Sequence, residues 1–425
     1  MKRLLKHKIR LSALALLAAG LMMVVLPALS ARLAAPPSGL GLVCETGTTF
    51  NLRAADTRVI MPDGNSIYMW GYTDRTSGPA ELPGPALCVT EGDTVTINLT
   101  NDLPVPTSII FPGQANVLAN GSPAQPQYNA GALASLTDMA AASGGTVSYS
   151  FIAGQPGTYL YESGTDPQLQ VEMGLYGLLV VRPAGHSNWA YNDSGTEFDP
   201  QREYMLLFHE IDPYLHDAIE QGAAFDMRDY HPRYYTINGR SFPDDLAPND
   251  VPWLPDQPYG AVVSVEPSTP GSLPALLRFA NAGLLSHPFH PHGNHHRIIG
   301  HDGHQLVGPN GEDASYEKFT LLVNPGQTYD ATFSWYDVEG WNELTNPVPV
   351  TGPSLQNLVF EGSWYSGSPY LGQPGEFPVG TTINNECGEY YFMWHSHAGQ
   401  EMINWNEGGG GMITWLRVDP PGGCP

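Results

Sequence analysis

Hydrophobic and polar residues alternate in short stretches along much of the chain, and this pattern predicts strands rather than helices. Residues 94–100 alternate strictly after a Glu-Gly-Asp turn, and residues 146–151 alternate again. Successive side chains of a strand point to opposite faces of a sheet, so a period of two is typical of a strand with one buried face. Apolar and aromatic content adds expected strands at 66–72, 157–161 and 177–181. The first part of the chain therefore predicts a β-sandwich.

A second set of expected strands follows after a polar, turn-rich stretch. These strands are expected at 202–208, 261–265, 274–279, 319–323, 329–335, 389–397 and 411–418. One short helix is expected from Pro213 to about Gln221, because Asp212 can cap its start and proline suits the first helical position.

The composition supports two domains built from short strands. The chain has 425 residues, of which 47 are glycine and 39 are proline, and so many turn-forming residues argue against an all-α protein. Its length exceeds that of one ordinary sandwich. We predict an all-β protein with a first domain at 42–185, a linker at 186–201 and a second domain at 202–425. Residues 112–145 show no convincing period and are expected to form a long loop.

The net charge limits the kinds of molecule that the protein is expected to bind. Acidic residues outnumber basic ones by 42 to 18, which gives a formal net charge of −24. A chain this acidic is not held by nucleic acid or by anionic lipid through bulk electrostatics. A metal ion is the expected partner, and the pattern leaves the oligomeric state open.

The N-terminal residues 1–30 resemble a secretory signal. Basic residues end at Arg10, an apolar run extends from Leu11 to Leu29, and small residues follow. We expect the protein to be secreted, periplasmic or extracellular. If this segment is retained, it is the only expected membrane contact, as an anchor at the cell surface.

The four cysteines of an exported chain suggest two disulfides. Cys44–Cys88 with Cys387–Cys424 is the local pairing. Pairing between the two ends of the chain stays open on the sequence alone.

The histidines are unevenly placed. None lies between His7 and His186, whereas seven fall within residues 287–304. In a strand, residues two apart share a face, so His290 and His292 point one way together, and so do the two histidines of His395-Ser-His397. Imidazole nitrogens suit copper and zinc. Two such pairs on adjacent strands would hold a metal ion through His290, His292, His395 and His397.

These motifs resemble those of a known family. His287-Pro-Phe-His-Pro-His-Gly293 resembles the His-Pro-x-His-x-His-Gly motif of multicopper oxidases, and His395-Ser-His397 followed by Gly411-Met412 resembles their His-Cys-His motif with its downstream Gly-Met. Gly157-Thr-Tyr-Leu-Tyr161 also resembles the first domain of that family. The resemblance implies two Greek-key cupredoxin-like β-sandwich domains in tandem.

The sequence departs from the family where dioxygen reduction would take place. The resemblance implies a three-copper cluster held by eight histidines from two domains. Ser108-Ile-Ile-Phe-Pro-Gly113 stands where Ser-Ile-His-Trp-His-Gly is expected, so Ile110 and Pro112 replace two of these histidines. Glu162 and Gly164 replace two more. Full four-copper oxidase chemistry is therefore not expected.

The electron-entry copper of the family is altered as well. Such a site needs a thiolate, two imidazoles and often a weak axial thioether. Ser396 stands at the thiolate position and Glu401 at the second imidazole position, while His287 is retained and Met412 stands near the axial position. No blue copper is expected, and His287, Glu401 and Met412 are secondary candidates for a weaker metal site.

We predict an exported multicopper-oxidase-like protein that binds one copper ion through some of the four histidines. The ligands do not exclude zinc. At most, a limited one-site oxidoreductase reaction is expected, and the sequence assigns no catalytic residue. One alternative is a metal-free secreted structural or interaction module on a cupredoxin scaffold. Another is an oxidase whose missing ligands come from a different chain.

The remaining candidate ligands have simpler interpretations. Glu162 is a further candidate carboxylate ligand. The short helix explains the residues that flank it without a metal, namely His209, Glu210, His216 and Asp217. Four more histidines are expected on loops and strand surfaces, namely His295, His296, His301 and His304.

Overall fold

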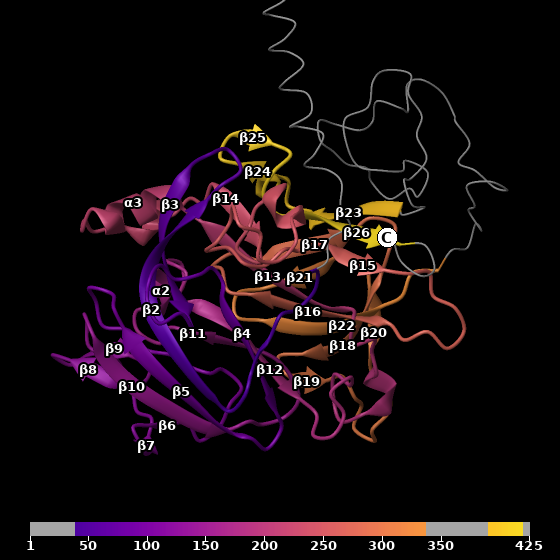
Figure 1. Cartoon of the computed structure of the whole chain (residues 1–425), viewed down its shortest axis with the longest axis horizontal. Coiled ribbons are helices and arrows are strands. Elements are labelled where there is room, and N and C mark those ends of the chain that lie inside the picture. Colours follow the sequence, from indigo (N-terminus) through magenta and orange to yellow (C-terminus); the bar gives the residue numbers. More distant parts are fainter. Residues whose placement is uncertain (1–38, 337–389, 420–425) are drawn as a thin grey trace, which may run out of the picture. The chain divides into compact units, whose positions relative to one another are not determined.

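The computed structural model describes residues 39–336 and 390–419 (Figure 1). The N-terminal segment 1–30, with its expected signal, lies outside these residues, and so do Cys387 and Cys424. Within the described part of the chain, every helix is too short or too polar to cross a bilayer.

Two sheets hold most of the strands that precede residue 183. One has four strands in the order β1 (Glu45–Thr46), β4 (Gly84–Thr90), β12 (Tyr176–Arg182) and β11 (Gly157–Glu162). The other has six, in the order β3 (Ser66–Thr73), β2 (Thr49–Ile60), β5 (Thr94–Asn101), β10 (Gly145–Ile152), β6 (Leu118–Ala119) and β7 (Ser122–Pro123). The alternation at 94–100 becomes β5, whose Val95, Ile97 and Leu99 are buried.

Two further sheets hold the strands from residue 203 onward. The larger follows the order β19 (His304–Gln305), β18 (His296–His301), β22 (Thr328–Phe333), β16 (Ala275–Asn281), β13 (Glu203–Ile211), β14 (Tyr234–Ile237), β24 (Ile403–Asn404) and β25 (Glu407–Gly408), with β20 (Tyr316–Lys318) paired to β18. The smaller follows the order β15 (Val263–Val265), β26 (Ile413–Val418), β23 (Tyr390–Ser396), β17 (His287–Pro291) and β21 (Leu321–Val323).

The predicted all-β class, with two cupredoxin-like sandwiches in tandem, is confirmed. Each pair of sheets encloses its own apolar core. Parallel pairings such as β2 with β5 and β13 with β16 connect strands that are distant in the chain, as Greek-key crossovers do. A third apolar cluster combines residues of both parts, including Val180 and Leu207. The proposed boundaries at 42–185, 186–201 and 202–425 stay a prediction.

Helical structure is sparse. The described helices are α2 (Pro167–Gln170) and α3 (Pro213–Glu220), together with short 3-10 turns at 194–196, 227–229, 244–246 and 399–401. The predicted helix is confirmed as α3, since the Asp212 carboxylate accepts hydrogen bonds from the backbone amides of Tyr214 and Leu215. The prediction of one long loop at 112–145 was wrong in part. These residues contain β6 and β7 and the small hairpin of β8 (Gln127–Asn129) with β9 (Ala132–Ser135).

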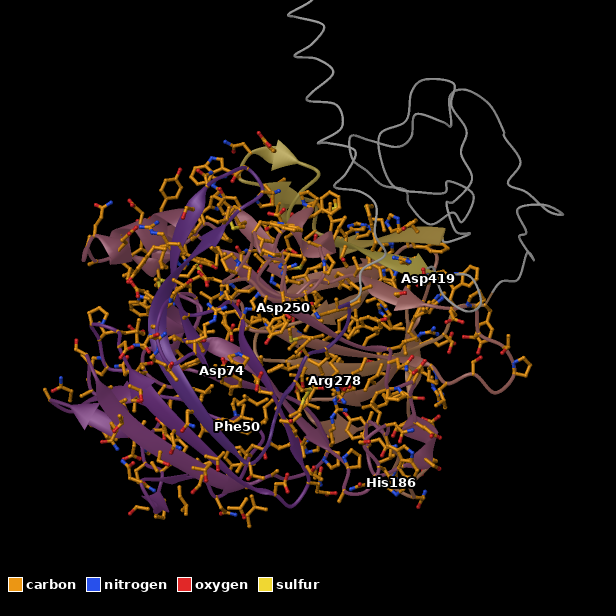
Figure 2. All side chains as sticks on the ribbon, in the orientation of Figure 1. Phe50, Asp74, His186, Asp250, Arg278 and Asp419 are labelled. Atoms are coloured by element: carbon orange, nitrogen blue, oxygen red, sulfur yellow. A yellow bond between two sulfur atoms is a disulfide. The ribbon has the colours of Figure 1, made fainter. Side chains whose placement is uncertain are left out.

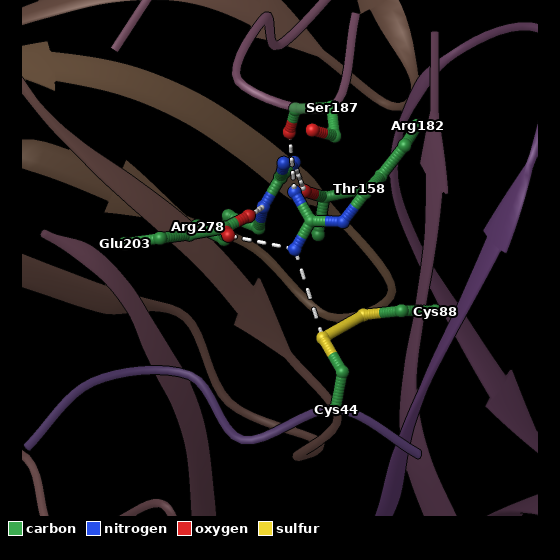
Figure 3. Close-up of a disulfide and its surroundings, with 7 residues drawn as sticks. All are labelled: Cys44, Cys88, Thr158, Arg182, Ser187, Glu203 and Arg278. Carbon is green, nitrogen blue, oxygen red and sulfur yellow. Dashed lines mark hydrogen bonds and ion pairs between the residues drawn. A yellow bond between two sulfur atoms is a disulfide. The ribbon is translucent and has the colours of Figure 1, made fainter. Parts of the chain in front are cut away.

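A buried polar cluster joins strands of the two sandwiches. Arg278 is fully buried in the interior (Figure 2), and its guanidinium donates to Glu203 Oε1 at 2.6 Å and to Thr158 Oγ1 at 2.8 Å. Arg182 donates to the second oxygen of Glu203 at 2.7 Å (Figure 3). Because both oxygens of one carboxylate are held by arginines from different sheets, this cluster fixes how β12, β13 and β16 align.

The disulfide Cys44–Cys88 lies beside this cluster, with Cys44 Sγ 3.7 Å from the Arg182 guanidinium (Figure 3). This bond agrees with the local pairing. The pairing of Cys387 and Cys424 stays a prediction, since both lie outside the described residues.

Candidate metal centre

Two adjacent strands bring the histidine motifs together. β17 and β23 are antiparallel, and His290 lies directly opposite His395 in their register. The backbone amide of His292 donates to Met393 O at 3.1 Å, and that of His397 donates to Pro288 O at 2.7 Å. Phe289 and Trp394 are buried in the core, so the strand alternation turns the imidazoles of their neighbours to the other face.

Three of the four predicted ligands converge. The ligating nitrogens of His290, His292 and His395, here called the imidazole trio, lie within 4.8 Å of one another. The Nε2 atoms of His292 and His395 are 2.8 Å apart. His397 lies next to the trio, with its ring centroid 4.7 Å from that of His290, but it is not part of the converging group.

Hydrogen bonds orient the trio. His395 Nδ1 lies 2.5 Å from Ser396 O, and because a carbonyl only accepts, this nitrogen carries the proton and leaves the Nε2 lone pair free. His292 Nε2 must then donate the hydrogen bond to His395 Nε2. His290 Nδ1 lies 2.7 Å from Thr320 Oγ1. Partners of this kind fix the ring orientation and tautomer of metal-binding histidines.

The trio is neutral at neutral pH. Burial, reinforced by the neighbouring histidines, lowers the pKa of His292 to about 4. The same causes lower the pKa of His395 to about 4 and also lower that of His290. No imidazolium form therefore competes with a metal at neutral pH, and binding through His292 Nε2 requires only that its proton move to the other ring nitrogen.

His287 has a different environment. Its Nδ1 lies 2.9 Å from Glu401 Oε2 and its Nε2 lies 3.0 Å from Glu210 Oε2, all three side chains being buried. Burial alone would lower the pKa of His287, but the two carboxylates outweigh burial and raise it to about 9. The hydroxyl of Ser396 donates to the same oxygen of Glu401. At neutral pH, His287 is thus an imidazolium ion between two carboxylates.

The secondary metal site at His287, Glu401 and Met412 stays a prediction. Both nitrogens of His287 are engaged by carboxylates, and Met412 is buried in the apolar core. Sequence reasoning missed Glu210 as a partner of His287, because the two residues are 77 positions apart. No spacing within a strand could have indicated this contact.

The first-domain positions that would carry histidines in the family lie side by side. The backbone of Ile110 and that of Glu162 exchange hydrogen bonds at 2.8 and 3.2 Å. Ile110 and Pro112 line an apolar surface pocket of about 260 Å³. Burial raises the pKa of Glu162 to about 7. Among the described residues, the converging group of metal-type donors does not include Glu162.

The remaining histidines of residues 287–304 are held by packing or by hydrogen bonds. His301 stacks on Tyr329, and His304 Nδ1 lies 2.8 Å from Asp302 O. The ring of His295 contacts Phe319. The surface prediction was wrong for His296, which is fully buried, because its place in β18 turns it toward the core aromatic Trp394.

Comparison with known proteins shows which families this chain is similar to. Residues 60–186 match the sequence model of a multicopper oxidase domain. Laccase-3 from Oryza sativa subsp. japonica is 31% identical over 260 residues, which cover 59% of this chain but only 38% of that protein. The chain therefore aligns with well under half the length of this relative.

Two solved structures share the fold. The blue copper oxidase from Nitrosomonas europaea is 20% identical with a TM-score of 0.57, and the match covers 89% of this chain and 87% of that one. A second multicopper oxidase is 18% identical with a TM-score of 0.56 and the same coverage of both chains. The sequence match and the two structural matches thus both indicate similarity to multicopper oxidases.

Proposed function

We propose that this multicopper-oxidase-like chain is a copper-binding protein that holds one copper ion through His290, His292 and His395. The convergence of three neutral imidazoles is the observation that carries this proposal. An all-nitrogen set of this kind suits copper, and a zinc ion is the competing occupant. Bound copper would supply one-electron redox chemistry at this position.

The chain's own residues prepare the trio for a metal. Ser396 O holds the Nδ1 proton of His395, so the Nε2 lone pair points into the group. Thr320 Oγ1 orients His290. In the metal-free protein, His292 and His395 share one proton, and a metal ion would replace it.

The proposed redox activity is limited to this one site. Ile110, Pro112, Glu162 and Gly164 stand where the resemblance implies histidines, and they offer no imidazole. Ser396 offers no thiolate for an electron-entry copper. We further propose that the protein is exported, which rests on the N-terminal sequence and agrees with the disulfide Cys44–Cys88.

The test is copper retention by the full chain. After copper loading and dialysis, metal analysis and paramagnetic resonance should show one equivalent of nitrogen-coordinated copper. His395→Ala should lose it, whereas the control His301→Ala, on β18 in the other sheet of the sandwich, should keep it. Failure to retain copper, or equal retention by His395→Ala, would contradict the proposal.

A metal-free module is the second candidate. The direct hydrogen bond between His292 and His395 favours it, because this contact satisfies both nitrogens without an ion. This candidate predicts that copper addition leaves the thermal midpoint unchanged, whereas a ligand that binds only the folded state raises it.

A further inference from the structure

The first sandwich has an open pocket of about 260 Å³ at the place where the resemblance implies copper-binding histidines. Ile110 and Pro112, which replace two of these histidines, line it. Glu162 and Gly164, which replace the other two, are bonded to lining residues through the backbone. Ile110 exchanges hydrogen bonds with Glu162, and the amide of Leu136 donates to Gly164 O at 2.8 Å. All four substituted positions therefore lie in the pocket or directly beside its wall.

The substitutions fit one another. A Cβ atom added at Gly164 would lie 2.6 Å from Ile110 Cγ2 and 3.4 Å from Leu136 Cβ. Non-bonded carbon atoms are optimally about 3.5–4.0 Å apart, so a side chain at Gly164 has no room beside Ile110. The isoleucine occupies the space that a histidine at Gly164 would need. This wall of the pocket is therefore packed with apolar atoms and not merely stripped of its histidines.

The lining is uncharged, although the whole chain has a formal net charge of −24. Within the described part of the chain, no charged residue lines the pocket, and its apolar side chains include Ile109, Ile110, Phe111, Pro112, Val117 and Leu136. Phe111 joins the lining to the aromatic core, with its ring centroid 4.9 Å from that of Phe151 and 5.8 Å from that of Tyr149. Such a lining favours an uncharged aromatic ligand, because aromatic rings pack well against one another in tilted arrangements.

Exposed apolar side chains continue beside the pocket. The hairpin of β8 and β9 connects Ala124 to Leu136, both of which line the pocket. Leu136 is exposed, and so are Tyr128 and Leu133, which lie opposite each other in the hairpin. Exposed apolar groups that gather beside a concave site are typical of binding surfaces.

One polar group of the lining has an unused donor. Among the described lining residues, only Gln114 and Thr137 have polar side chains. Gln114 Oε1 accepts a hydrogen bond from Gly154 N at 3.0 Å, which fixes the orientation of the amide. Its Nε2 is buried and has no hydrogen-bond partner among the described residues. Because an unsatisfied buried donor is costly, a ligand that supplies an acceptor to it is favoured.

We propose that this pocket binds an uncharged aromatic molecule with one hydrogen-bond acceptor, such as an aryl ketone. The rings would contact Ile110 and Leu136, and the carbonyl oxygen would accept from Gln114 Nε2. An apolar cavity of about 150 Å³ holds benzene, so the pocket has space for roughly two fused rings. Since no residue of the imidazole trio lines the pocket, this binding is a property beyond the proposed copper site.

Calorimetry on the metal-free full chain tests the proposal, with methyl naphthyl ketone as the probe. We expect one molecule to bind per chain. Naphthoate has the same rings but carries a carboxylate, and it should bind at least about 10-fold more weakly, because its charge would lose hydration in an uncharged pocket. Absence of ketone binding, or equal affinities for the two probes, would overturn the proposal.

A charge in the wall should remove the site. Ile110→Asp is expected to abolish binding of the ketone. The matched control is Ile60→Asp, since Ile60 is an exposed isoleucine of the same sandwich, on β2, and does not line the pocket. It should leave the affinity unchanged. Binding that survives Ile110→Asp, or that is lost equally in both variants, would contradict the assignment.

A measurement on the unchanged protein covers the case in which Ile110→Asp does not fold. In crystals soaked with the brominated ketone, anomalous diffraction should place bromine beside Ile110 and Leu136. Bromine at other places only would overturn the proposal. The competing occupant is a second copy of the chain, which sedimentation detects. An oligomer that Ile110→Asp dissociates, and that excludes the ketone, would overturn the proposal as well.

Discussion

His290 of the imidazole trio and His287 lie only three residues apart on β17, yet the trio is neutral and His287 is positively charged. His290, His292 and His395 face one another and are neutral, whereas His287 lies between Glu210 and Glu401 and is protonated. The same side chain is thus neutral, as a metal ligand must be, in one environment and a cation in the other. Neighbouring carboxylates, rather than burial, make this difference, because both environments exclude much of the water.

The largest expected contrast is in proton affinity. His287 should titrate with a pKa of about 9, and His292 and His395 with pKa values of about 4, when the metal-free protein is followed by NMR of the imidazole protons. The separation, about 5 pH units, corresponds to roughly 10⁵-fold in proton affinity. Similar pKa values for the two groups would contradict the comparison.

The next contrast is in copper affinity. His292→Ala removes one of three ligands and should weaken copper binding more than 100-fold, since loss of an outer partner alone costs roughly 10–100-fold. His287→Gln should change the affinity less than about 3-fold, because His287 is not a ligand of the trio. Isothermal titration calorimetry checks both values. An equal loss in both variants would mean that the two groups act as one site.

For stability, the order of the two variants is reversed, and His287→Gln has the larger effect. His287→Gln leaves Glu210 and Glu401 buried without their cation, and we expect a loss of about 3 kcal/mol in the free energy of unfolding at pH 7. His292→Ala should cost less, because its ring is neutral and only half-buried. Urea unfolding measures both variants.

The pH dependence of this loss follows from the direction in which folding shifts the pKa of His287. The folded-state pKa of His287, about 9, lies above the ordinary value of 6.5. Its charge therefore stabilises the fold fully below pH 6.5, and this contribution is lost as the pH rises through 9. The difference between wild type and His287→Gln should shrink by pH 10. A difference that stays constant from pH 7 to pH 10 would show that His287 is not charged.

The smallest expected effect concerns the hydrogen bond that orients the ring of His290. Thr320→Val removes the hydroxyl that lies 2.7 Å from His290 Nδ1, and copper affinity should fall about 10-fold. The exposed Thr269 is the control, since Thr269→Val should leave the affinity unchanged. Equal affinities for both variants would show that the trio needs no outer partner.

A group of four histidines at this place could be predicted from the sequence, because the information that indicates it is local. His290 and His292 share a strand face, as do His395 and His397, and the resemblance pairs their two motifs. The opposite parity of His287 likewise placed it on the side of Ser396, and both residues do contact Glu401. The sequence could not indicate that the ring of His397 lies beside the group rather than in it.

Contacts between strands that are distant in the chain could not be predicted from the sequence. Glu210 meets His287 because the two sheets of the second sandwich face each other, and Glu172 lies near His209 and His216 because the two sandwiches pack together. The strands within 112–145 were missed for another reason. They have two to four residues each, which is too few to show a period.

The disulfide Cys44–Cys88 bears on how this protein avoids self-association. The strand β1 has only two residues, yet it covers one edge of β4, with Thr46 paired to Cys88. Two residues of backbone pairing are a weak cover, and the covalent bond keeps that cover in place. Reduction would free β1 and expose an unpaired strand edge, which is a template for edge-to-edge pairing. The reduced protein is therefore expected to aggregate before it unfolds.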